Sequence, residues 1–181
     1  MGLAVCLITC IILSACSNDA ESVRFFEQKV LPLQTVTNGK VDRSEYGRKQ
    51  VHLEAPKIVQ YGEPDPRTEY PDGVQLWIYD SESHNLKAYV KAGFAVSHDN
   101  TKLTEVRDKV VIIDYGTGDT SYLHDLYWNS QEKRVYSNKP VRSVNGNRVT
   151  YGDGFESDDN FDQPMILRQR GTIEWKEEES Q

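Results

Sequence analysis

Acidic side chains crowd one stretch near the C-terminus, and their spacing matches no catalytic or metal-binding pattern. The stretch contains Asp153, Glu156, Asp158, Asp159 and Asp162. A calcium loop of the EF-hand type places carboxylates at alternating positions, which this spacing does not do. A glycosidase needs two facing carboxylates, but any of many pairs could be proposed here. We therefore expect this stretch to be a solvated loop.

The other reactive side chains are equally dispersed. His52, His84, His98 and His124 fall on different predicted strands or loops, and none has metal-ligand spacing. No Gly-x-Ser-x-Gly motif occurs that would mark a hydrolase nucleophile. We expect no catalytic residue, no metal, no cofactor and no enzymatic activity.

All three cysteines lie within the first sixteen residues, which indicates export. The uncharged run from Leu3 to Leu13 is too short to span a bilayer and fits a signal peptide. Leu13-Ser14-Ala15-Cys16 resembles a bacterial lipobox, whose cysteine is acylated and becomes the first mature residue. The alternative is a buried apolar helix that ends in cysteine. We expect residues 1–15 to be a lipoprotein signal peptide, and residues 16–33 to tether the acylated Cys16 to a membrane.

Charge and length limit the partners and the kind of domain expected of the remaining chain. It has 28 Asp and Glu against 21 Lys and Arg, a net charge of -7. Neutralisation of phosphates dominates nucleic-acid binding, so nucleic acid is an unsuitable partner. A domain over residues 34–175 is long enough to bury a core without disulfides, followed by a charged tail at 176–181.

Apolar residues alternate with polar ones in short runs separated by turn signals. Val51, Leu53 and Ala55 alternate in this way, as do members of the runs 74–78 and 90–96. Asn38-Gly39, Tyr70 to Gly73, Tyr115 to Gly118 and Asn145-Gly146 are typical turn sequences. The pattern predicts an antiparallel meander of strands, each with one face toward a core.

Two predicted strands are apolar on both faces. One is Val110 to Ile113, and in the other, Leu76 to Tyr79, the second face is aromatic. They could be central strands of a two-sheet sandwich with one face covered by a loop. They could equally line an opening between two sheets that accommodates hydrocarbon chains. The sequence alone leaves both interpretations open.

A series of motifs resembles the LptC family, in its lipoprotein-type branch. Besides the lipobox, the motifs are Leu53-Glu54-Ala55-Pro56, Tyr70 to Val74, Lys109 to Ile112, Thr120 to Trp128, Arg134 to Ser137 and Gly152 to Asp158. The resemblance implies a twisted, incompletely closed antiparallel β-jellyroll of the LptA/LptC type. It further implies a periplasmic bridge that accepts lipopolysaccharide from the LptBFG ABC transporter and passes it to LptA. The protein would be lipid-anchored, most simply to the inner membrane.

Under this hypothesis the acyl chains of lipid A travel in an apolar trough. Inward candidates follow from alternation within each strand, with the choice of face set by parity alone. They are Leu53, Ala55, Val74, Leu76, Ile78, Val90, Phe94, Val110, Ile112, Leu126 and Trp128. We expect sugars and phosphates to stay outside this trough.

The resemblance also assigns two docking edges and two glycines. The transporter-side edge would include Val36, Val41 and Tyr46, and the LptA-side edge Ile166, Leu167 and Ile173. Gly152 and Gly154 match a late strand where a side chain would obstruct close backbone approach; a turn or bulge would explain them equally well.

Two other functions remain open. A glycan-binding β-sandwich lipoprotein would use Trp77, Tyr79, Tyr127 and Trp128 as an exposed stacking platform. A small hydrolase would draw on the carboxylates of the Asp153 to Asp162 loop.

Overall fold

The protein is all-β in a computed structural model that describes residues 31–174. Fourteen strands form one large antiparallel sheet that does not close into a barrel, which confirms the predicted incompletely closed β-jellyroll. The predicted signal peptide, Cys16, all of the tether before Leu31 and the tail at 176–181 lie outside the described residues.

The strands follow the chain as a meander of short and long segments. The first seven are β1 (Gln34–Glu45), β2 (Arg48–Tyr61), β3 (Arg67–Tyr70), β4 (Val74–Tyr79), β5 (Leu86–Ala92), β6 (Phe94–His98) and β7 (Leu103–Asp114). The last seven are β8 (Thr120–Asn129), β9 (Arg134–Ser137), β10 (Val141–Asn145), β11 (Arg148–Gly152), β12 (Phe155–Asp158), β13 (Met165–Ile166) and β14 (Gly171–Glu174).

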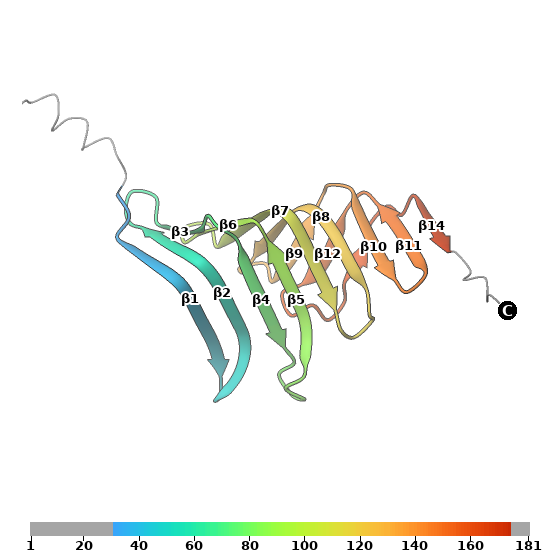
Figure 1. Ribbon diagram of the computed structural model, residues 1–181, viewed down its shortest axis with the longest axis horizontal. Coiled ribbons are helices and arrows are strands. Elements are labelled where there is room, and N and C mark those ends of the chain that lie inside the picture. The colour runs from blue at the N-terminus through green and yellow to red at the C-terminus, as the bar shows by residue number, and fades with distance from the viewer. Residues whose placement is uncertain (1–30, 175–181) are drawn as a thin grey trace, which may run out of the picture. The chain divides into compact units, whose positions relative to one another are not determined.

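Three long strands fold the sheet into two layers. β2 pairs with β4 through Val51–Glu54 and with β3 through Val59–Tyr61. β7 likewise pairs with β6 and then β5, and β8 with β10 and then β9. The sheet therefore bends along a line that crosses these strands (Figure 1). We call the layer of β4, β5, β10, β11 and β14 the β14 wing, and the layer of β3, β6, β9, β12 and β13 the β13 wing.

Local backbone features produce the bend. In β7 a bulge at Asp108 and Lys109, both with positive φ, separates the half that pairs with β6 from the half that pairs with β5. Gly93 joins β5 to β6 at the same level, and its N–H donates to the Asp108 carbonyl at 2.7 Å. A bulge adds a residue to one strand and turns it sharply, so the chain crosses from one wing to the other here.

The turn predicted at Asn38-Gly39 is wrong, because both residues lie inside β1. Asn38 has a φ of 51°, and the registered pairs on either side of it leave Pro56 of β2 opposite. Proline has no N–H to donate, so the ladder is interrupted and β1 can bend with β2. The hairpin turn is instead Tyr46-Gly47, with φ of 51° and 76°. Two positive φ values match the twist of a two-residue hairpin.

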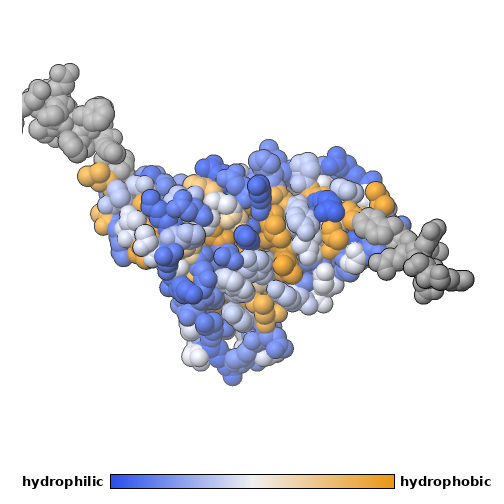
Figure 2. All heavy atoms as spheres, viewed as in Figure 1, coloured by the Kyte–Doolittle hydropathy of each residue, from blue (hydrophilic) through white to orange (hydrophobic). Residues whose placement is uncertain are grey.

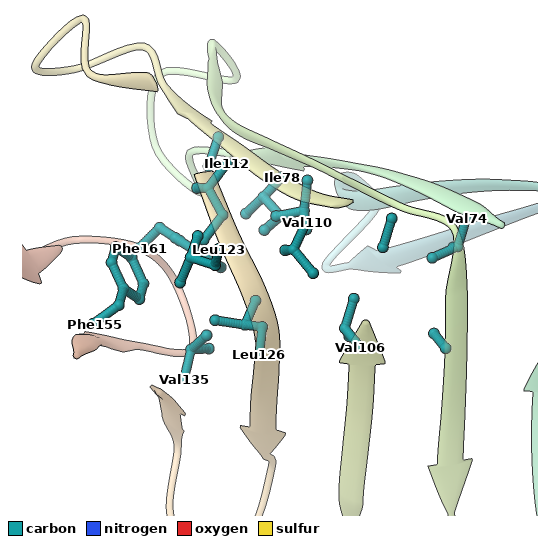
Figure 3. Close-up of a cluster of buried hydrophobic side chains, with 14 of the residues drawn as sticks. Val74, Ile78, Val106, Val110, Ile112, Leu123, Leu126, Val135, Phe155 and Phe161 are labelled. Atoms are coloured by element: carbon teal, nitrogen blue, oxygen red, sulfur yellow. The ribbon is translucent and has the colours of Figure 1, made fainter. Parts of the chain in front are cut away.

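The core fills the space between the wings near the bend. Val110, Leu126, Val135 and Phe155 are at most 2% exposed and point toward one another from β7, β8, β9 and β12 (Figure 3). Truncating one of these side chains would cost about 2–5 kcal/mol of stability.

Phe94 does not face the core, which contradicts its predicted inward position. Its neighbour Ala95 lines the space between the wings, whereas Arg107 places its guanidinium 4.1 Å from the Phe94 ring centroid on the outside. The prediction assumed one continuous strand from Val90 to Val96. Because the chain bends at Gly93, the alternation changes phase there.

The two glycines of the late strand lie where the chain passes close to itself. A Cβ on Gly152 would lie 2.6 Å from the Leu167 carbonyl oxygen, and one on Gly154 would lie 3.0 Å from the Ser137 carbonyl oxygen. Of the two explanations left open, close backbone approach therefore holds at both positions. Gly154 also has a φ of 155°, where it links β11 to β12.

We predict that Gly152→Ala destabilises the domain, because backbone atoms must move to accept the methyl group. The expected loss is about 1–3 kcal/mol in urea unfolding. Gly171→Ala is the matched control, since Gly171 pairs with Tyr151 next to Gly152 and nothing lies within 4 Å of its added Cβ. Equal free energies of unfolding for the two variants would show that the close approach at Gly152 does not affect stability.

Candidate functional site

An apolar cavity of about 210 Å³ opens between the two wings at the β1 end of the sheet. Both wings line it. Its apolar walls are Val51, Leu53, Val74, Leu76 and Val90 on one side, and Tyr70, Ala95, Val106, Leu126 and Trp128 on the other. Arg43, Ser97 and Thr104 complete the lining. Hydrocarbon is the ligand chemistry that such walls accept.

Strand register explains why the predicted residues converge there. Leu53 pairs with Leu76, and Leu76 with Val90, so their side chains form one row on the inner face. Tyr70 and Trp128 face this row from the β13 wing. Trp128 is fixed edge-on against Phe161, with ring centroids 5.9 Å apart. Burial raises the pKa of the Tyr70 hydroxyl, consistent with an apolar surrounding.

Six of the eleven predicted inward residues line this cavity, namely Leu53, Val74, Leu76, Val90, Leu126 and Trp128. Ile78 and Val110 also face inward, but they lie in the closed core. Ile112 is buried in the same core, at the wall of a second cavity nearer β14. Ala55 is buried beside a separate small hollow formed with β1. Phe94 alone lies on the outer surface.

Four apolar lining residues were not among the predicted inward side chains, namely Val51, Tyr70, Ala95 and Val106. Val51 and Val106 each stand between polar neighbours, so strand alternation could have found both. Ala95 stands between Phe94 and Val96, so alternation alone does not select it. Tyr70 belongs to a segment that reads as a turn, and its inward position depends on pairing with Ala95 of β6.

The second apolar face of the central strands lies on the outside of the β14 wing. Trp77, Tyr89 and Ile113 are consecutive partners across β4, β5 and β7, and all three are half-buried. The Trp77 and Tyr89 ring centroids are 5.2 Å apart. Hydrophobic atoms gather across the middle of the face in Figure 2. These residues therefore do not contribute to the cavity between the wings.

Both predicted docking edges contain unpaired strand edges. At one end of the sheet, β1 pairs only with β2 among residues 31–174. On β1 and its turn, Val36 is half-buried, Val41 is 50% exposed and Tyr46 is 95% exposed. At the other end, β11 is the only described strand that pairs with β14, and Ile173 of β14 is 55% exposed. Unpaired strand edges offer N–H and C=O groups to an added strand.

Ile166 and Leu167 are less suited to that role. Ile166 pairs with Phe155 and contributes to the inner lining near the β14 end. Leu167 follows β13, donates its N–H to Gly154 and accepts from the Asp153 N–H. Since both backbone groups of Leu167 are already used, Ile173 on β14 is the better edge residue.

Charged groups join β1 to β2 on the outer face. Asp42 accepts from Lys49 at 2.9 Å and from His52 Nδ1 at 2.6 Å. Glu54 accepts from Lys40 at 2.6 Å and from His52 Nε2 at 3.2 Å. Hydrogen bonds from Lys49 and then His52 lower the pKa of Asp42, and those from Lys40 and then His52 lower the pKa of Glu54.

The acidic stretch near the C-terminus does not assemble into one site. Asp153 binds Arg170, Glu156 binds Arg134 and Asp162 binds Lys87. Arg134 is also the first cause of the lowered pKa of Glu156. Across residues 31–174, no three His, Cys, Asp or Glu side chains come together in a way that could hold a metal ion.

Comparisons with known proteins do not assign the chain to a family. No family model matches it, and a search of curated proteins finds no relative. Within residues 31–174, no helix has the length and hydropathy to cross a membrane. The fold, the cavity and the strand edges are therefore the observations that bear on function.

We predict that acid loosens the β1–β2 hairpin. The folded pKa values of Asp42 and Glu54 lie below their ordinary values of 3.8 and 4.5. Such a shift stabilises the fold above the ordinary values, and the stabilisation is lost as pH falls through the lower folded values. The protection of β1 amides, measured as the exchange rate relative to the intrinsic rate at the same pH, should therefore fall below about pH 4.

The double variant Asp42→Asn/Glu54→Gln is the control, because it keeps the shapes and removes the titrating groups. Its β1 amides should exchange faster than those of the natural chain at pH 6, and the difference should shrink toward pH 3. A difference that grows on acidification would contradict the assignment.

Proposed function

We propose that this protein is a lipid-transfer bridge of the LptC type. It accepts lipopolysaccharide from an LptBFG transporter, shields the acyl chains between its wings and passes them to LptA. The observation that carries the proposal is the apolar cavity lined from both wings at the β1 end. Acylation of Cys16 would hold the chain at the membrane from which the lipid is taken.

The energetics of lipid transit support a trough of this kind. Each methylene exposed to water costs about 0.8 kcal/mol, so several acyl chains cannot cross an aqueous space unshielded. The cavity is lined by aliphatic and aromatic side chains. An acyl chain in this cavity would therefore contact apolar side chains and not water.

The cavity as it stands is too small for a lipid with several acyl chains. Its volume of about 210 Å³ falls short of the roughly 300–1,000 Å³ of sites that enclose a drug-sized ligand. Beyond it, Val110, Val135 and Phe155 fill the space between the wings. The wings must separate for a lipid with several acyl chains to enter. They can do so because β13 and β14 are not paired with each other.

The unpaired edges suit a relay between proteins. Adding a strand to β1 at one end and to β14 at the other would extend the same sheet in both directions. The inner faces of successive proteins would then be continuous. A lipid could move from one to the next without passing through water.

The glycan-platform alternative receives less support. Trp77 packs on Tyr89 outside the β14 wing, whereas Trp128 faces the cavity. Tyr127 stacks on Tyr136 with ring centroids 5.5 Å apart, on strands of the β13 wing. These aromatics lie on separate surfaces, so they do not form one stacking platform.

We predict that lipopolysaccharide can be captured in cells by photo-crosslinkers at Leu76 and Trp128, which face each other across the cavity. A crosslinker at Phe94 is the matched control, since this side chain is apolar but lies on the outer surface under Arg107. Lipopolysaccharide adducts at both cavity positions and none at Phe94 are expected on immunoblots. Adducts at Phe94 alone, or at no position, would refute the trough.

A further inference from the structure

The inner face of the β14 wing changes chemistry along a single cross-strand row. Each member is the registered partner of the next, in the order Leu53, Leu76, Val90, Ile112, Ser121, Ser143, Thr150 and Thr172. The first four side chains are aliphatic and the last four carry hydroxyls. Registered partners on one face lie side by side, so the row is aliphatic toward β2 and hydroxyl-bearing toward β14.

The hydroxyls are joined in pairs. Ser121 Oγ donates to Ser143 Oγ at 3.0 Å, and both side chains are buried. Thr150 and Thr172 approach at 3.3 Å. A hydroxyl has one donor and two acceptor sites, so each pair keeps hydrogen-bonding capacity for a further group.

These hydroxyls line a second cavity, of about 510 Å³, between the wings at the β14 end. Ile112, Phe155 and Ile166 supply its apolar surface. Its volume lies within the range of roughly 300–1,000 Å³ that is typical of small-molecule sites. The cavity therefore combines an apolar wall with a row of hydrogen-bonding groups.

Two charged side chains at this cavity have no side-chain partner among residues 31–174. In the described part of the chain, neither the Asp119 carboxylate nor the Arg148 guanidinium has a hydrogen bond or ion pair. Asp114, in contrast, is occupied by the Gly116 N–H at 2.8 Å and the Thr117 hydroxyl at 3.0 Å. Asp119 and Arg148 thus offer acceptors and donors to a ligand.

We propose that this cavity binds the saccharide headgroup of the carried glycolipid, one or two pyranose rings in size. Sugar hydroxyls both donate and accept, which suits Asp119, Arg148 and the free capacity of Thr150. The C–H face of a pyranose is apolar and suits Phe155 and Ile166. The identity of the saccharide as a lipid headgroup rests on the proposed function, but the site itself does not.

Other ligand classes fit less well. A hydrocarbon chain would desolvate Asp119 and Arg148 without replacing their hydrogen bonds. A bare anion such as phosphate would meet two carboxylates, Asp114 and Asp119, against one guanidinium. A neutral polyol ring avoids both penalties. This places at least part of the headgroup between the wings, not outside as the sequence led us to expect.

The test is ligand-observed NMR on the full chain in lipid nanodiscs. The probes are an N-acetylglucosamine disaccharide and maltose, with inorganic phosphate as the anion control. Saturable binding of at least one sugar with a Kd at or below about 1 mM is expected. Arg148→Gln and Thr150→Val should each weaken it about tenfold. Arg142→Gln, on the outer face of the neighbouring strand, should leave it unchanged.

A fluorescent acyl probe, read in the same samples, separates this site from the proposed function. Sugar binding without acyl binding would overturn the lipid bridge and keep the saccharide site. Acyl binding without sugar binding, or phosphate binding in place of sugar, would overturn the saccharide site. A glycolipid that binds no more tightly than its deacylated headgroup would overturn the assignment to a lipid headgroup.

Discussion

The bend across the long strands is the constraint on which the rest of the structure depends. A flat sheet of this length would leave one apolar face in water, and no helix among residues 31–174 is available to cover it. Bending β2, β7 and β8 brings the inner faces of both wings together, so that each wing buries the other. The bulge at Asp108 and Lys109 and the close approaches at Gly93, Gly152 and Gly154 are the local means of that bend.

The same bend leaves the sheet incompletely closed, and the proposed function depends on that opening. Since β13 and β14 are unpaired with each other, the wings can separate at the cost of side-chain contacts, with no ladder hydrogen bond broken between these two strands. The interior is also graded, from aliphatic near Leu76 to hydroxyl-bearing near Thr150. An amphiphile lying along the row would find partners for both its parts, with its hydrocarbon toward β1 and its polar end toward β14.

Sequence patterns predicted which face of a strand a side chain occupies. They missed the features that arise from pairing between strands. Alternation placed Leu53, Leu76 and Val90 on the inner face, because parity holds within an unbroken strand. It failed at Phe94, where the chain changes wings, and Asn38-Gly39 formed a bend in place of a hairpin turn. The sequence did not predict the hydroxyl row, because its members become neighbours only through cross-strand register; they are Ser121, Ser143, Thr150 and Thr172.

The most direct test of the account is the distance between the wings with and without lipid. The β4–β5 hairpin tip and the β6–β7 turn lie on opposite wings away from the bend, and spin labels at Ser83 and Asn100 would report their separation. The account predicts that binding of lipopolysaccharide adds a population with a longer distance in pulsed electron paramagnetic resonance. An unchanged distance distribution with lipopolysaccharide demonstrably bound would contradict it.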